Sequence, residues 1–159
     1  RNFMLKLGIG LNVIAASLIA LPVIGFVLSA VVKTKAYQAW IPLGKIEDFP
    51  SGQTRLATYR NPFTRPWDGF TGDLPCWVRH IDGQRFQVFA INCAHLGCPV
   101  RWFPESGLFM CPCHGGVYYE DGRVAAGPPP RGLYEYEHKI KGDELWVRAG
   151  RIPTLAQSV

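Results

Sequence analysis

The fold of this 159-residue chain is decided by two sequence boxes, Cys93-Ala-His95-Leu-Gly-Cys98 and Cys111-Pro-Cys113-His114-Gly-Gly116. Four of the five cysteines and two of the four histidines lie in the 22 residues from Cys93 to His114. Isolated cysteines are usually small buried apolar residues. Cysteines packed this densely and interleaved with histidine indicate a metal site instead.

Three kinds of metal site compete for these residues. A structural zinc site needs four ligands in a closed tetrahedron, so two of the six candidates would be idle. An iron–sulfur cluster held by four cysteines would leave both histidines without a role. A [2Fe–2S] cluster that takes one cysteine and one histidine from each box uses four candidates, and the two remaining cysteines can pair with each other.

Both boxes closely resemble the signature of Rieske iron–sulfur proteins, Cys-x-His-Leu-Gly-Cys followed by Cys-Pro-Cys-His-Gly. The resemblance implies that Cys93 and Cys111 bind one iron of a [2Fe–2S] cluster. It implies that His95 and His114 bind the other iron. These two histidines would also be the catalytic residues, since one of them would accept the hydrogen bond from a quinol.

The same resemblance assigns roles to the residues around the cluster. Cys98 and Cys113 would form a disulfide that ties the two boxes together. The Tyr118 hydroxyl would bond to a ligand cysteine sulfur, and Leu96 would cap the cluster beside the quinol pocket. Gly116 stands where ubiquinol-oxidising members typically have a serine that bonds a bridging sulfide. Its lack of a hydroxyl predicts a lower potential and a menaquinol substrate.

Ligand chemistry explains why these residue types suit quinol oxidation. Neutral imidazoles in place of two thiolates remove negative charge, and Rieske potentials of about −150 to +300 mV exceed the roughly −400 mV of plant-type clusters. Each imidazole also keeps a ring nitrogen that can exchange a proton as iron changes oxidation state. A disulfide in the head would indicate an oxidising compartment.

Other residues near the boxes are expected to be less specific. Gly127 to Pro130 resembles the family's proline loop, which covers the cluster, and Ala94 replaces a threonine that many members carry. His80 and His138 are expected to be ordinary strand histidines. Cys76 is expected to be a buried thiol.

A transmembrane helix is predicted from Leu7 to Val32, which contains no charged residue in 26 positions. As a helix it would be about 39 Å long, enough to cross a bilayer with some tilt. A buried core helix would need a polar stripe, and a cleaved signal peptide would have a shorter apolar region. The flank 1–6 resembles the end of a twin-arginine export signal, and residues 33–40 are predicted to be a flexible neck.

The net charge of +5 does not indicate a nucleic-acid-binding surface. Residues 41–159 carry 13 basic and 12 acidic side chains, so the head is nearly neutral. The remaining basic residues flank the apolar run and are Arg1, Lys6, Lys33 and Lys35. Nucleic acid is therefore excluded as a partner.

The head, residues 41–150, is predicted to be all-β, a small antiparallel barrel or sandwich with a cluster-binding subdomain at about 91–130. Residues 40–44 and 48–52 alternate apolar residues with turn formers, which predicts strand, turn, strand. Hairpins are predicted at 76–91, where Asp82-Gly83 would form a type I′ turn, at 119–124 and at 133–148. Residues 61–75 are predicted to be a loop, and 151–159 a tail.

The resemblance to Rieske proteins, with the Cys98 and Cys113 pair and the apolar anchor, implies the iron–sulfur subunit of a quinol:cytochrome c (or plastocyanin) oxidoreductase, an electron-transfer subunit that is not catalytic alone. It would take the first electron from quinol and pass it to a c-type haem, with the head swinging on the neck. The implied partners are a cytochrome b-type subunit, a c-type cytochrome, quinol and the lipid bilayer, within a larger, dimeric membrane complex. The head would lie on the periplasmic side of a bacterial inner membrane. The alternative is the small Rieske subunit of a periplasmic molybdenum oxidase of the arsenite oxidase type.

Overall fold

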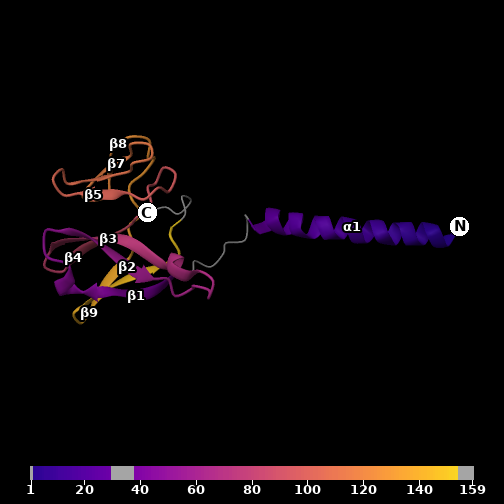
Figure 1. Ribbon diagram of the computed structural model, residues 1–159, viewed down its shortest axis with the longest axis horizontal. Helices are drawn as coiled ribbons and strands as arrows, with labels where there is room; N and C mark the ends of the chain where they lie inside the picture. Colours follow the sequence, from indigo (N-terminus) through magenta and orange to yellow (C-terminus); the bar gives the residue numbers. More distant parts are fainter. Residues whose placement is uncertain (1, 30–37, 154–159) are drawn as a thin grey trace. The chain divides into compact units, whose positions relative to one another are not determined.

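A computed structural model describes residues 2–29 and 38–153 of the chain. The chain divides into two compact units, residues 1–36 and 37–159. The first unit contains one helix and the second contains the β-rich head (Figure 1). The prediction of an all-β head preceded by one apolar helix is confirmed.

Helix α1 runs from Asn2 to Ser29 and is long and apolar enough to cross a membrane. It begins five residues before the predicted Leu7, because Phe3, Met4 and Leu5 extend the apolar surface beyond Lys6. Pro22 lies inside the helix, as membrane helices tolerate. The predicted end at Val32 and most of the predicted neck lie outside the described residues.

The described part of the head contains ten strands, all paired antiparallel. They are β1 Gln38–Lys45, β2 Thr54–Arg60, β3 Asp73–Asp82, β4 Arg85–Ala90, β5 Arg101–Phe103, β6 Leu108–Met110, β7 Val117–Tyr119, β8 Val124–Ala126, β9 His138–Lys141 and β10 Glu144–Gly150. The sheets have the orders β1-β10-β9, β2-β3-β4 and β5-β6-β7-β8. In Figure 1 the last sheet forms a separate lobe above the other two.

The two three-stranded sheets form a base around one apolar core. Alternate residues of β3 and β10 point into it, which is the period-2 pattern of a half-buried strand. The sheets are joined where Tyr136 N–H donates to the Val88 carbonyl at 2.7 Å. Core residues with almost no exposure include Cys76, Val78, Val88, Leu145 and Val147.

The small lobe, residues 91–130, has its own core of Phe89, Val100, Phe109 and Tyr118 together with Cys93 and Cys111. The Trp77 indole on β3 donates to the Val100 carbonyl at 3.2 Å, which fixes the lobe to the base. The core also includes Leu133, so two of its seven buried residues are cysteines of the boxes. The packing of the lobe core therefore also fixes the positions of the two boxes.

Three details of the predicted base are wrong. Residues 48–52 are not a strand, because the Asp48 carboxylate accepts the Lys45 N–H and stabilises a short 3₁₀ turn over Ile46–Asp48. The second strand is instead β2, which the sequence analysis placed in no element. Gln38 to Trp40, assigned to the neck, already pair with β10.

The predicted type I′ turn at Asp82-Gly83 is also wrong. Gly83 has a φ of +50°, but no described non-glycine residue has a positive φ. A type I′ turn needs positive φ at both central residues. The hairpin itself is correct, with β3 pairing to β4.

Candidate metal centre

The first box forms a tight loop between β4 and β5. Cys93 N–H donates to the Cys98 carbonyl at 2.8 Å, and Gly97 N–H donates to the Cys93 carbonyl at 2.9 Å. Gly97 has a φ of +82°, in the left-handed region that glycine adopts without a side-chain penalty. These bonds hold the backbone of Cys93 and place Leu96 at the tip, where it is 61% exposed.

The second box forms the turn between β6 and β7. Cys111 N–H donates to the Gly116 carbonyl at 2.7 Å, so the box closes on itself just as β7 begins. A disulfide joins Cys113 of this turn to Cys98 of the first box, across 15 residues of sequence. The two loops are thus clamped side by side.

The candidate ligands differ in how deeply they are buried in the lobe. Cys93 and Cys111 are free thiols and are buried, at 1% and 4% exposure. His95 is half-buried and His114 is exposed. The two imidazole rings lie together, with centroids 4.9 Å apart and planes nearly perpendicular. The site therefore presents two sulfur donors inside the lobe and two nitrogen donors at its surface.

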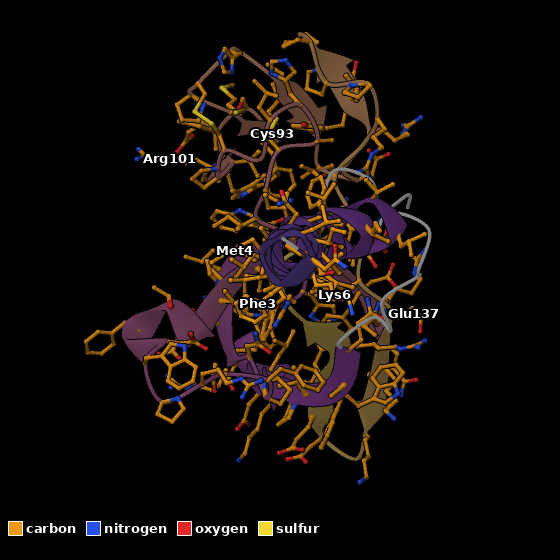
Figure 2. The ribbon with its side chains drawn as sticks, turned by 90° about the vertical axis from the view of Figure 1, so that its right-hand side faces the viewer. Phe3, Met4, Lys6, Cys93, Arg101 and Glu137 are labelled. Atoms are coloured by element: carbon orange, nitrogen blue, oxygen red, sulfur yellow. A yellow bond between two sulfur atoms is a disulfide. The ribbon has the colours of Figure 1, made fainter. Side chains whose placement is uncertain are left out.

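Tyr118 is the fully buried residue that orders this arrangement. Its hydroxyl lies 3.0 Å from the Cys93 sulfur and accepts the Ala94 N–H at 3.0 Å. Because the oxygen already accepts one bond, its own proton is available for the sulfur. Figure 2 shows Cys93 inside the lobe, at the level of its strands.

Electrostatics favour a cation at this place. Burial raises the pKa of the Cys93 thiol, and the adjacent Cys111 thiol raises it further against the lowering effect of the Tyr118 hydroxyl. Two buried thiolates side by side are therefore unfavourable without positive charge between them. Iron supplies that charge, and a set of two thiols and two imidazoles fits a [2Fe–2S] group of the Rieske kind.

One further sulfur cluster among the described residues combines Cys111 with Cys98 and Cys113, whose sulfurs all lie within 4.8 Å of one another. Two of these three sulfurs are used in the disulfide, so they are not thiolate donors. We therefore assign the metal centre to the free thiols and the two histidines.

The proline loop packs directly against the second box. Pro129 is buried, and a Cβ added at Gly116 would lie 2.8 Å from its Cγ and 3.4 Å from the Cys93 sulfur. Gly127 has a φ of +91°, and a Cβ there would overlap the Gly115 carbonyl oxygen. Close approach thus explains both glycines, and at Gly116 the backbone φ is not positive.

The remaining candidates of the sequence analysis lie elsewhere. Cys76 is buried in the base core, where burial raises its pKa to about 12. His80 is buried in the base and its ring nitrogens bond the carbonyls of Phe49 and Gly83 at 2.6 and 3.1 Å. His138 is half-buried on β9.

Two contacts at the site had no signal in the sequence. The Ala94 backbone N–H is a donor to Tyr118, and a backbone group carries no residue-type signature. The Asn92 amide donates to the Pro153 carbonyl at 2.9 Å, which ties residues after β10 to the start of the first box. A separation of 61 residues makes this contact invisible to local pattern reading.

Comparisons with known proteins agree with this geometry. Residues 39–137 match the model of the Rieske [2Fe–2S] domain family. The chain is 31% identical over 147 residues to the cytochrome b6-f complex iron–sulfur subunit of Chlorobaculum tepidum, covering 92% of this chain and 74% of that one. The corresponding subunit of Chlorobaculum thiosulfatiphilum is 27% identical with the same coverage.

Among solved structures, the head is similar to the plasma membrane Rieske protein PetC3 of the cyanobacterium Synechocystis PCC 6803. The TM-score is 0.51 at 26% identity, covering 68% of this chain and 98% of that one. The chain belongs to the Rieske [2Fe–2S] family, and its cofactor is a Rieske [2Fe–2S] cluster.

Removing the Tyr118 hydroxyl should lower the reduction potential of the cluster. The bond to the Cys93 sulfur is stronger in the reduced, more negative state, so Tyr118→Phe destabilises that state. A bond to a charged group contributes about 1.5–3 kcal/mol, and a one-electron couple shifts about 59 mV per 1.4 kcal/mol, so we expect a fall of roughly 60–130 mV. Redox titration followed by EPR measures it. An unchanged potential would show that the hydroxyl does not reach the cluster sulfur.

Proposed function

We propose that this chain is the iron–sulfur subunit of a quinol:cytochrome c (or plastocyanin) oxidoreductase. The observation that carries the proposal is the arrangement of the ligands, with buried thiols behind two accessible imidazoles. A redox centre reached through imidazoles at the lobe surface, one half-buried and one exposed, can exchange electrons with a molecule that docks at the lobe tip. The relatives from Chlorobaculum are subunits of cytochrome b6-f complexes, and the apolar helix α1 suits a membrane complex.

We assign proton and electron transfer at the tip to His95 and His114. When bound, the cluster supplies a one-electron acceptor at a potential that quinols can reach. A ring nitrogen of either histidine accepts the quinol hydroxyl proton, and the exposed Leu96 gives the docked ring an apolar contact. The buried Cys93 and Cys111 exclude water from the sulfur side, which Tyr118 also covers.

We also propose on which side of the membrane the head lies and which protein accepts its electron. The Cys98–Cys113 disulfide is stable in an oxidising compartment, which favours a head on the extracytoplasmic side of a bacterial cell membrane. The chain would then deliver its electron to a c-type cytochrome on that side, with a cytochrome b-type subunit binding the quinol within a dimeric complex. Movement of the head on the segment between α1 and β1 would connect the two docking positions.

Menaquinol is the substrate that Gly116 favours. A hydroxyl at this position would lie close to the Cys93 sulfur, because a Cβ there would be 3.4 Å away from it. Its absence removes one of the two hydroxyl donors that stabilise the reduced state, while Tyr118 remains. A potential lowered in this way matches a quinol of lower potential.

Gly116→Ser tests the substrate assignment, with Gly116→Ala as the matched control. Both variants introduce the same Cβ against Pro129, so packing affects them equally. Only serine adds a donor, and we expect its potential to exceed that of the alanine variant. Equal potentials would assign Gly116 to packing alone, and a wild-type potential near the top of the Rieske range would contradict menaquinol.

Direct reduction tests the function itself. In membranes that contain the complex, menaquinol should produce the reduced cluster signal by EPR, and His114→Ala should abolish it. If a quinol does not reduce the cluster while an artificial reductant does, the proposed reaction is wrong.

A further inference from the structure

The most exposed apolar side chains of the described head lie on one loop. Residues 61–72, here called the aromatic loop, connect β2 to β3 and contain Trp67 and Phe70. Trp67 is 78% exposed and Phe70 is 93% exposed, against 61% for Leu96 at the lobe tip. Water solvates such rings poorly, so neighbouring exposed aromatics mark an interaction surface.

The aromatic loop is ordered by its own hydrogen bonds. Asn61 N–H donates to the Gly72 carbonyl at 2.8 Å, which closes the loop at its base. Within it, Arg65 N–H donates to the Asp68 carboxylate at 2.6 Å, and Thr71 N–H donates to the Asp68 carbonyl at 3.0 Å. The two rings are thus presented on a built turn rather than on a free segment.

The aromatic loop closes the end of the base at which β1 begins. The other end of β1 leads into residues 46–49, and there the His80 ring bonds the Phe49 carbonyl at 2.6 Å. Near the aromatic loop, the hydroxyls of Tyr59 on β2 and Tyr136 lie 3.2 Å apart. The Glu137 carbonyl accepts the N–H of Arg148, and Arg148 pairs with Trp40 near the start of β1. Figure 1 shows the β2–β3 connection at the right-hand end of the head.

The number of residues between the apolar run and β1 sets an upper limit on how far this end of the head can lie from a bilayer that α1 spans. The apolar run ends at Val32 and β1 begins at Gln38, so five residues separate them. Fully extended, that connection spans at most about 20 Å. The headgroup zone of a bilayer adds about 5–7 Å beyond the hydrocarbon edge. The tether is therefore short enough for the end of the head that carries the aromatic loop to reach the lipid headgroups.

We propose that the aromatic loop inserts Trp67 and Phe70 into the lipid headgroup interface, as a second and reversible membrane contact of the head. Tryptophan suits this zone because its ring is apolar and its N–H can still meet a polar partner. The charges on and beside the loop cancel, since Arg60 and Arg65 balance Asp68 and Asp73. Binding therefore depends on apolar insertion rather than on anionic lipid. The proposal rests on α1 as an anchor and not on the route of the electrons.

Quenching by brominated lipid tests the proposal on the full chain. The cluster-loaded protein is reconstituted in phosphatidylcholine vesicles whose acyl chains carry bromine near the headgroup, which quenches tryptophan on contact. We expect quenching in the wild type and a marked fall in Trp67→Phe. Trp146→Phe is the matched control, because Trp146 pairs with Pro42 toward the other end of the base, and it should keep the wild-type quenching. Equal quenching in Trp67→Phe and wild type would overturn the proposal.

Two further measurements separate the alternatives. Phe70→Ser should shift the Trp67 emission to the red and weaken the lipid quenching, because it removes one of the two inserted rings. If Trp67 is instead shielded from acrylamide only in the whole complex and never by lipid, a protein subunit covers the loop and the proposal is wrong. Flotation of every variant with vesicles after alkaline washing shows that α1 still anchors the chain, so failure of the anchor and of the loop give different results.

Discussion

Alanine at Cys93, His95, Cys111 or His114 is expected to abolish the Rieske EPR signal. Each of these side chains is a donor to the cluster in our assignment, and loss of one donor from a four-donor set opens an iron to water. Cys76→Ala is the control, because Cys76 is the third free thiol of the described chain and lies in the base core. It should retain full iron and a wild-type signal.

The disulfide cysteines should behave differently from the ligands. The double variant Cys98→Ala/Cys113→Ala removes the clamp without leaving a freed thiol within 4.8 Å of Cys111. A bridge across about 15 residues contributes roughly 3 kcal/mol in the chain-entropy model. The variant should therefore lose its cluster faster while the residual signal keeps its shape. A changed iron coordination in an intact cluster would contradict the division of the six residues.

Gly127→Ala is expected to empty the metal centre although it alters no ligand. The residue has a φ of +91°, and a Cβ there would overlap the Gly115 carbonyl and approach the Gly116 Cα at 3.0 Å. The proline loop would have to move away from the second box. We expect iron content to fall well below half, since side-chain strain at such a φ adds to direct backbone overlap.

Gly107→Ala separates these two causes. Gly107 lies in the β5–β6 turn of the same lobe with a φ of +66°, but no atom lies within 4 Å of an added Cβ. It should cost only about 1–2 kcal/mol of backbone strain and keep its iron. Iron analysis of both purified variants is the measurement. If both variants keep or lose iron equally, the contact between the proline loop and the second box does not hold the site.

Local sequence signals predicted the parts of the head that local chemistry determines. The hairpin of β3 and β4 followed from alternating apolar residues around Asp82-Gly83, and the strands pair as predicted although the turn is not type I′. Strand β2 was missed because four of its seven residues are threonine or arginine, and Tyr59 is the only buried residue of the strand. Residues 48–52 have the alternating pattern of a strand, but the Asp48 carboxylate accepts the Lys45 N–H and favours a turn.

At the site, the boxes identified the cofactor because the donors are close in sequence, and the family match confirms that cofactor. Packing between distant segments could not be predicted in the same way. The role of Gly116 illustrates the difference, since its contact with Pro129 depends on how the proline loop folds back over the second box. The sequence shows that residue 116 has no hydroxyl. Only the structure shows that there is little space for a side chain there.

The central claim is that this chain serves a quinol-oxidising cytochrome complex. Isolation of the complex from native membranes through a tag on this chain, followed by haem, molybdenum and EPR analysis, tests it most directly. The account predicts b-type and c-type haem with a reduced Rieske signal that menaquinol generates. Molybdenum without b-type haem would contradict the account and would identify the chain as the small subunit of a molybdenum oxidase.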